Sequence, residues 1–161
     1  MHRKVPAVAE SALAFGRKPA EDALLDNPSI LSHVSIGTDD LQRSAQFYDT
    51  VLATIGARRI MDVGEDAIAW GREWPEFWVN RPLDQRPSAP GNGTHIAFHA
   101  TSRGQVDAFY RAAIAAGATD CGAPGPRPEY GAPYYGCFVR DLDGHKIEAS
   151  FWDAEFESEE D

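Results

Sequence analysis

Several features that would place this chain in a specialised class are scarce or missing in its 161 residues. Its 2 cysteines, Cys121 and Cys137, are too few for the disulfide framework of a small secreted domain, so we expect a cytoplasmic protein. No apolar run approaches the roughly 20 residues that cross a bilayer. Charged residues interrupt residues 1–25, which predicts no secretory signal and no membrane partner.

Positive charge is also scarce. The chain has 15 Lys and Arg against 25 Asp and Glu, for a formal net charge of −10. Such an acidic balance disfavours nucleic acid as a partner. Six of the acids lie in residues 153–161, which we interpret as a solvated acidic tail.

The pattern of the chain predicts one folded domain over residues 29–152, after an N-terminal extension over residues 1–28. The extension is Ala-rich, and an amphipathic helix, a flexible arm and a segment that embraces a dimer partner fit it equally. From Ile30 the residues alternate in polarity as in a strand, up to Ile36. Helical spacing follows over residues 41–55, and short strands are expected at residues 58–63, 67–71 and 76–80.

A second series of elements follows the Pro- and Gly-rich linker 81–93. Residues 94–100 are expected to form a strand and residues 106–116 a helix. The Gly- and Pro-rich residues 122–133 are expected to form a long loop. Strands at 134–140 and 145–152 then surround the turn Asp141-Leu142-Asp143-Gly144, with His145 exposed beside it.

Matching spacings indicate an internal repeat. Phe47 follows His33 by fourteen residues, and Phe109 follows His95 by the same interval. We therefore predict an α+β fold with two βαβββ modules in tandem, residues 30–83 and 94–152. A module of this size is too small to bury an adequate core alone, so the two are expected to form one curved mixed sheet around a cleft, with the helices outside.

The repeat singles out three residues for metal chemistry. His33 and His95 occupy equivalent positions in the first strand of each module. Alternation in the last strand directs Glu148 away from the helix and toward the concave side. Two imidazoles and one carboxylate form the facial triad suited to divalent Fe, Mn, Ni or Zn, and they leave positions open for a substrate.

These residues fall within motifs that resemble the vicinal-oxygen-chelate superfamily, which includes glyoxalase I, extradiol dioxygenases and bleomycin-resistance proteins. The resemblance covers residues 30–152 and rests on His33-Val34-Ser35-Ile36, Asp40-Leu41-x-x-Ser44-x-x-Phe47-Tyr48, His95-Ile96-Ala97-Phe98 and Asp141-x-Asp143-Gly144-x-x-Ile147-Glu148. It implies that His33, His95 and Glu148 are metal ligands and that Glu148 is also catalytic. Because one scaffold hosts many chemistries, the resemblance does not select a reaction.

One position departs from glyoxalase I, which uses a fourth ligand, usually an acid, in the last strand of its first module. The symmetry mate of Glu148 falls on Trp78, which cannot serve as that acid. Trp78 instead predicts an aromatic wall for a flat or apolar substrate.

Four further residues are predicted to bind substrate with Trp78. His99 shares its side of the strand with His95, and Arg81 could pair with an anionic group. Tyr134 and Tyr135 could hydrogen-bond a substrate oxygen. Cys121 and Cys137 have no base at a recognisable spacing and are expected to be ordinary thiols.

Three functions remain open on this basis. The first is a glyoxalase-like metal-dependent lyase or isomerase acting on a small oxygenated molecule. The second is an Fe(II) dioxygenase of the extradiol type, which the three-ligand count favours. The third is a non-catalytic protein of the bleomycin-resistance type that binds a small molecule or drug. The resemblance also implies a homodimer.

Overall fold

The structure, a computed structural model, describes residues 30–131 and 133–153. The chain divides into two compact units, residues 1–32 and 33–161, and the helices and strands of the described part all belong to the second. The predicted extension over residues 1–28 lies outside the described residues, as does the predicted tail beyond residue 153. Among the helices of the described part, none has the length and apolar character needed to span a membrane.

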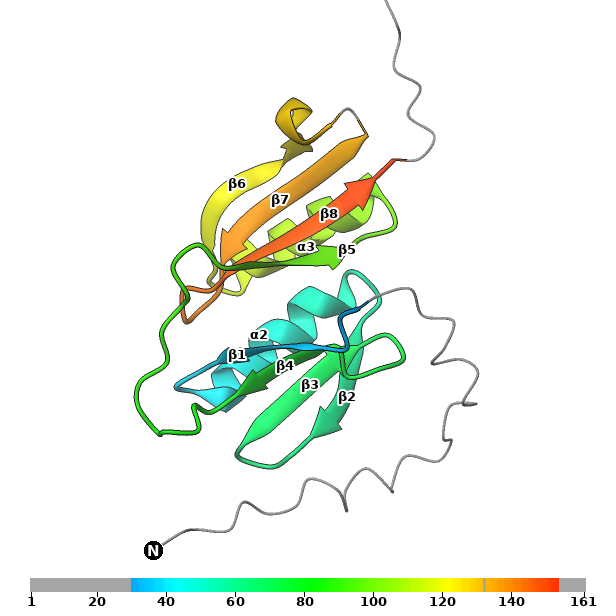
Figure 1. Cartoon of the computed structure of the whole chain (residues 1–161). Coiled ribbons are helices and arrows are strands. Elements are labelled where there is room, and N and C mark those ends of the chain that lie inside the picture. The colour runs from blue at the N-terminus through cyan, green and yellow to red at the C-terminus, as the bar shows by residue number, and fades with distance from the viewer. Residues whose placement is uncertain (1–29, 132, 154–161) are drawn as a thin grey trace, which may run out of the picture. The chain divides into compact units, whose positions relative to one another are not determined.

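The second unit contains the same series of elements twice, and Figure 1 shows each helix beside its own sheet. The first series is β1 (Val34–Gly37), α2 (Leu41–Ala53), β2 (Arg58–Asp62), β3 (Ala67–Gly71) and β4 (Phe77–Asn80). The second is β5 (His95–His99), α3 (Arg103–Ala115), β6 (Thr119–Pro126), the 3-10 turn η2 (Pro128–Tyr130), β7 (Tyr134–Arg140) and β8 (Lys146–Trp152).

The strand order confirms the duplicated βαβββ unit and the α+β class. The eight strands form two four-stranded sheets, ordered β1-β4-β3-β2 and β5-β8-β7-β6. In each sheet the first strand pairs in parallel with the last strand of its module, and the other pairs are antiparallel. One offset of 62 residues relates both ends of α2 to those of α3 and the last residue of β1 to the last residue of β5.

Side-chain caps explain where the helices begin. The Asp40 carboxylate accepts a hydrogen bond from Arg43 N at 3.0 Å, and the Ser102 hydroxyl accepts one from Gln105 N at 3.2 Å. Each cap satisfies an amide that has no partner within the first helical turn. Both predicted helices are therefore present, the second beginning three residues earlier than its apolar periodicity indicated.

Two predicted boundaries need correction. The strand expected over residues 30–36 begins only at Val34. The first part of the loop expected over residues 122–133, residues 122–126, belongs to strand β6, which pairs with β7 in a register interrupted on both sides of Gly122. Bulged pairing accommodates Gly and Pro, and this composition concealed the strand in the sequence.

The two halves of the unit share one core. Phe77 of β4 and Phe98 of β5 pack edge to face with ring centroids 5.1 Å apart, and Phe98 also contacts Phe109 of α3. The buried residues of both helices and both sheets form a single cluster. The prediction that neither half buries an adequate core alone agrees with this shared packing.

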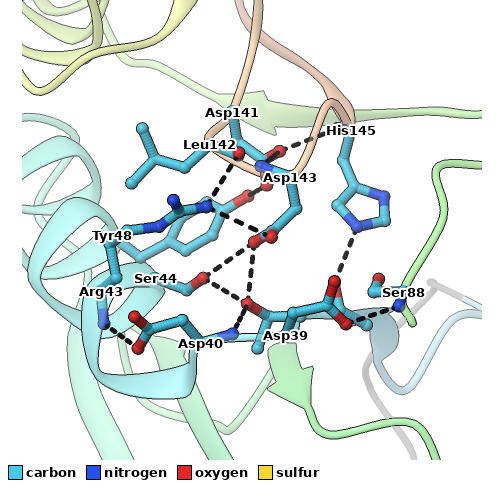
Figure 2. Close-up of polar contacts among 12 residues, drawn as sticks. Asp39, Asp40, Arg43, Ser44, Tyr48, Ser88, Asp141, Leu142, Asp143 and His145 are labelled. Atoms are coloured by element: carbon cyan, nitrogen blue, oxygen red, sulfur yellow. Dashed lines mark hydrogen bonds and ion pairs between the residues drawn. The ribbon is translucent and has the colours of Figure 1, made fainter. Parts of the chain in front are cut away.

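A polar network around the β7–β8 turn crosses between the halves (Figure 2). The hydroxyl of Tyr48 on α2 donates to Asp141 Oδ2 at 2.6 Å. Asp143 Oδ2 accepts from Thr38 Oγ1 at 2.8 Å and from Ser44 Oγ at 3.0 Å. These groups are buried or half-buried, so each bond is shielded from competing water. The turn sequence therefore joins the modules as well as closing a hairpin.

His145 belongs to this network, which corrects the expectation that it is exposed. Only 8% of the residue is accessible. Its backbone N–H donates to Asp141 Oδ1, and its Nε2 lies 2.8 Å from Gly37 O. An equivalent contact joins the β3–β4 turn of the first half to the end of β5 in the second half. There, Arg72 Nη2 donates to His99 O at 2.8 Å. Gly37 and His99 are equivalent positions at the 62-residue offset.

The Tyr48–Asp141 bond gives the first prediction. Tyr48→Phe leaves a buried carboxylate oxygen without its donor, which should lower the free energy of unfolding by about 1–3 kcal/mol. Tyr110 is the equivalent residue of α3 and is only half-buried. Tyr110→Phe is therefore the matched control, and it should cost less. Urea unfolding of both variants measures the difference, and equal losses would show that the bond between the halves has no special weight.

Candidate functional site

The site is built on the face of the second sheet that points away from α3. In β5, Ile96 and Phe98 pack toward the core, so the alternate residues His95, Ala97 and His99 lie on the opposite face. The pairing of β5 with β8 brings Glu148 beside Ala97. We call this surface the open face of the second sheet.

His95 and Glu148 form a pair on the open face. His95 Nε2 lies 3.2 Å from Glu148 Oε2, with 47% of the histidine side chain accessible and 8% of the glutamate side chain. The hydroxyl of Tyr134 donates to the second oxygen, Oε1, at 2.7 Å. The carboxylate is thus oriented from one side by a phenol and presents its other oxygen to an accessible imidazole.

Tyr134 is suited to remain a donor. Burial, followed by the hydrogen bond and charge of Glu148, raises the pKa of the Tyr134 phenol well above its ordinary value of about 10. At neutral pH the proton therefore stays on the phenol. Tyr134 also packs edge to face against Tyr130 and Trp152, at centroid distances of 5.2 and 5.4 Å. This aromatic trio borders the pair on one side.

Phe138 of β7 borders the pair within the sheet. It is the register partner of Glu148, and its ring centroid lies 6.3 Å from that of His95. The ammonium group of Lys146 lies 4.5 Å from the centroid of the same ring. The pair therefore stands between an apolar wall and a cation, two kinds of surface that can orient a small molecule.

In the first sheet, the position equivalent to Glu148 holds Trp78. Trp78 pairs with Ser35, two residues after His33, as Glu148 pairs with Ala97, two residues after His95. The sequence-based placement of Trp78 is therefore confirmed by the register. The Trp78 indole is half-buried, donates to Pro75 O at 2.9 Å and lies 6.4 Å from the His33 ring between centroids.

The three predicted ligands are not gathered within one chain. His95 and Glu148 are together, whereas His33 lies beside Trp78. Over residues 30–131 and 133–153, no group of three His, Cys, Asp or Glu side chains is close enough to hold a metal ion.

The His95–Glu148 pair nevertheless fits two positions of a metal site. Protein nitrogen and oxygen ligands lie about 2.0–2.2 Å from a divalent ion such as zinc, so two ligands at right angles are about 3 Å apart. The observed separation of 3.2 Å between Nε2 and Oε2 agrees with that value. The phenol on Oε1 leaves Oε2 as the donor oxygen. The chemistry of the pair therefore suits a divalent ion whose remaining ligands come from elsewhere.

The other residues predicted to bind substrate lie in different places. His99 is exposed on the open face. Tyr135 is directed to the helix side, where its hydroxyl donates to Asp107 at 2.9 Å and its ring lies under Arg103. Strand alternation forces Tyr134 and Tyr135 onto opposite faces, so only Tyr134 joins the pair. Arg81 is exposed beyond the end of β4, in the other half.

Sequence reasoning missed Lys146 and Phe138 and left the role of Tyr134 unspecific. The signal for Lys146 was present, because it precedes Glu148 by two residues in the same strand and must share its face. Phe138 required the β7–β8 register. The cysteines are consistent with ordinary thiols: Cys137 is buried, and burial raises its pKa to about 11, which leaves it protonated at neutral pH.

Comparison of the sequence with models of known protein families shows the family of the chain. Residues 30–149 match the model of the Glyoxalase/Bleomycin resistance protein/Dioxygenase superfamily. The chain belongs to this superfamily. A crystal structure of a glyoxalase/bleomycin resistance protein from Albidiferax ferrireducens T118 is 35% identical to the chain, with a TM-score of 0.70, and the match covers 76% of this chain and 98% of that one.

More distant superfamily structures share the fold. A glyoxalase/bleomycin resistance protein/dioxygenase family enzyme from Burkholderia phytofirmans PsJN is 23% identical, with a TM-score of 0.60 over 76% of this chain and 98% of that one. Lactoylglutathione lyase from Agrobacterium tumefaciens is 19% identical, with a TM-score of 0.56 over 78% of this chain and 94% of that one. A search of curated proteins found no match.

The raised pKa of Tyr134 gives the second prediction. The unfolded chain loses this phenolic proton near pH 10, whereas the folded chain keeps it to higher pH. The unfolded state then binds fewer protons, so the free energy of unfolding must fall as pH rises above about 10. Tyr134→Phe should reduce that fall, measured by urea unfolding between pH 9 and 12.

Tyr130→Phe is the control for this experiment, since Tyr130 is 53% exposed and lies in the same aromatic trio. It should leave the alkaline slope unchanged. If Tyr134→Phe also leaves the slope unchanged, folding does not raise the pKa of the Tyr134 phenol.

Proposed function

We propose that the chain is a glyoxalase-like metal-dependent enzyme that acts on a small oxygenated molecule at the open face of the second sheet. The observation that carries the proposal is the His95–Glu148 pair, with its 3.2 Å ligand separation and its carboxylate oriented by Tyr134. Superfamily membership supports the same reading. His33 is the third protein ligand in this proposal.

A second copy of the chain supplies that third ligand. His95 and Glu148 lie in one half of the unit and His33 in the other, and no three-donor cluster forms within the described part of one chain. In a symmetric dimer, the His33 edge of one protomer can meet the His95–Glu148 pair of its partner, and the symmetry repeats the arrangement. The proposed site is therefore shared between protomers, which also accounts for the predicted homodimer.

His33, His95 and Glu148 would hold a divalent ion there, and the ion would supply Lewis-acid stabilisation of a substrate oxyanion. The chain's own residues position the reactants. Tyr134 holds the Glu148 carboxylate in one orientation, and the Phe138 ring and the aromatic trio provide an apolar surface beside it. Glu148 is the catalytic carboxylate of this proposal, the one acidic side chain placed to take part in proton transfer. The absence of a second carboxylate at Trp78 leaves one acid–base group where a four-ligand site would have two.

Complementation between protomers gives the third prediction. His33→Ala and Glu148→Gln should each abolish binding of Ni²⁺, Zn²⁺ or Mn²⁺, measured as bound metal per protomer. When the two variants are unfolded, mixed and refolded together, random pairing produces heterodimers with one intact shared site, so the stoichiometry should recover to about a quarter of the unmodified protein. His99→Ala is the matched control on the open face and should bind metal normally.

Each outcome of the mixing experiment is decisive. Recovery in the mixture requires ligands from two protomers. No recovery, with both variants folded by circular dichroism, would contradict the shared site. Metal binding by Glu148→Gln equal to that of the unmodified chain would remove the metal-dependent function altogether.

Substrate assays separate the reaction types. With Ni²⁺ or Zn²⁺ bound, turnover of a hemithioacetal supports the lyase or isomerase reading. With Fe²⁺ bound, oxygen uptake with catechols supports the extradiol reading. Activity in one assay that His95→Ala abolishes assigns the reaction, and inactivity in both would exclude the two named reaction types.

A non-catalytic binding function is the second candidate, favoured by the aromatic trio of Tyr130, Tyr134 and Trp152. Trp152 is 51% exposed and Tyr130 is 53% exposed, so flat aromatic surface is accessible beside the site. Under this reading, bleomycin quenches tryptophan fluorescence in the absence of added metal. Trp152→Leu should then abolish the quenching.

A further inference from the structure

A cavity of about 450 Å³ lies next to His95, between the linker residues 90–94 and the second sheet. The sheet contributes His95, Lys146 and Arg140 to its wall. These three side chains form one row across β5, β8 and β7, because His95 pairs with Lys146 and Lys146 pairs with Arg140. Neighbouring strands are about 4.8 Å apart, so the row places Lys146 next to the accessible imidazole and Arg140 one strand further on.

Contacts within the protein hold the two cations without neutralising them. Arg140 Nη1 donates to Gly144 O at 2.8 Å, and the Lys146 ammonium lies over the Phe138 ring. Among the described residues, no acidic side chain lines the cavity. Neither cation forms an ion pair with a carboxylate in the described part of the chain.

This pairing of cations is informative because the chain is rich in acids, with 25 Asp and Glu against 15 Lys and Arg. In the described part of the chain, four arginines, Arg43, Arg59, Arg86 and Arg103, lie within ion-pair distance of an aspartate, and the other Arg and Lys side chains, including Arg140 and Lys146, do not. Arg140 is exposed and Lys146 is half-buried, so both charges remain available to an anion that enters the cavity. The opposite wall is formed by the linker residues 90–94, none of which is charged.

We infer that this cavity binds the oxyanion group, a carboxylate or phosphoryl group, of a small organic acid. The Arg140 guanidinium offers a planar fork of donors, and the Lys146 ammonium adds a point charge from the adjacent strand. Because His95 lines the cavity and also faces Glu148, an acid held there extends its other oxygens toward the His95–Glu148 pair. Lys146 and Glu148 are two residues apart, about 6.8 Å along the strand, a distance that a small molecule spans.

The inference deepens the proposed function by assigning an anionic substrate, and it rests on that function only for the reaction at the pair. It also assigns the anionic group to a place other than Arg81, the residue predicted from the sequence. Arg81 is exposed in the first half of the unit, where it lies outside this cavity.

Anion binding to the full chain without added metal tests the inference. Inorganic phosphate and lactate serve as the probes, and binding is measured by calorimetry and by amide shifts of residues 91–94. Lys146→Met keeps the aliphatic stem over Phe138 and should weaken binding at least tenfold, as should Arg140→Gln. Lys146→Arg should retain binding. Arg81→Gln removes the same unit of charge at a distant position and should bind both probes normally.

The two probes distinguish the sources of the oxyanion. Tighter binding of phosphate selects a phosphoryl group, and tighter binding of lactate selects a carboxylate. Equal weakening by Lys146→Met and Arg81→Gln would show only a response to net charge and would overturn the inference. Failure of the unmodified chain to bind either probe would overturn it as well.

Metal binding separates this inference from the proposed function. Lys146→Met should bind metal with unchanged stoichiometry, since Lys146 is not one of the three ligands. If metal binding fails in the unmodified chain but the anions bind at Lys146 and Arg140, the cavity assignment stands and the metal-dependent function falls. If the unmodified chain binds metal but neither anion, the anion site is excluded and the metal-dependent function stands.

Discussion

The structure depends on the attachment of the β7–β8 turn to the first half of the unit. The Asp141 carboxylate accepts a hydrogen bond from the buried hydroxyl of Tyr48, and the Asp143 carboxylate accepts hydrogen bonds from the hydroxyls of Thr38 and Ser44 (Figure 2). Burial, with the charge of Asp141, raises the pKa of Tyr48, so the phenol remains a donor throughout the physiological range. Without such bonds, buried carboxylates on this turn would carry a large desolvation cost. The polar network thus permits an acidic turn to lie inside a shared hydrophobic core.

This attachment has a consequence for the site. The turn that joins the halves is also the turn that leads into β8, the strand of Lys146 and Glu148. Arg140 donates to Gly144 O within the same turn, and His145 lies within hydrogen-bond distance of Gly37 O. The contacts that hold the two halves together therefore also fix the start of the strand that carries the candidate ligand. Stability of the core and precision of the open face have one physical origin.

Sequence reasoning recovered most of the fold because the duplicated pattern constrains both halves together. The equivalence of His33 with His95 predicts that Trp78 holds the position in the first module that Glu148 holds in the second. The strand registers agree with this equivalence. The repeat could not reveal strand β6, whose Gly and Pro residues suppress the usual alternation. It also could not reveal the burial of His145. A buried histidine needs a hydrogen-bond partner for its ring nitrogen, and here the partner is the backbone carbonyl of Gly37, which is distant in the sequence.

The site was less predictable because its neighbours come from the pairing of strands rather than from spacing along one strand. Tyr134 and Glu148 are fourteen residues apart and meet only through the β7–β8 hairpin. Which tyrosine of the adjacent pair faced the site was decided by the phase of alternation in β7, which the Gly- and Pro-rich stretch before it left undetermined.

Divergence between the two halves is what makes a specific site from a symmetric scaffold. Equivalent positions hold Glu148 in one half and Trp78 in the other, so the repeat offers two histidines but a single carboxylate. In the proposed site, such a donor set would leave positions open for a substrate, whereas a second carboxylate would have added negative charge. The lower charge favours an anionic substrate, since fewer protein carboxylates then repel it. The cation pair beside His95 and the missing acid at Trp78 thus act in the same direction.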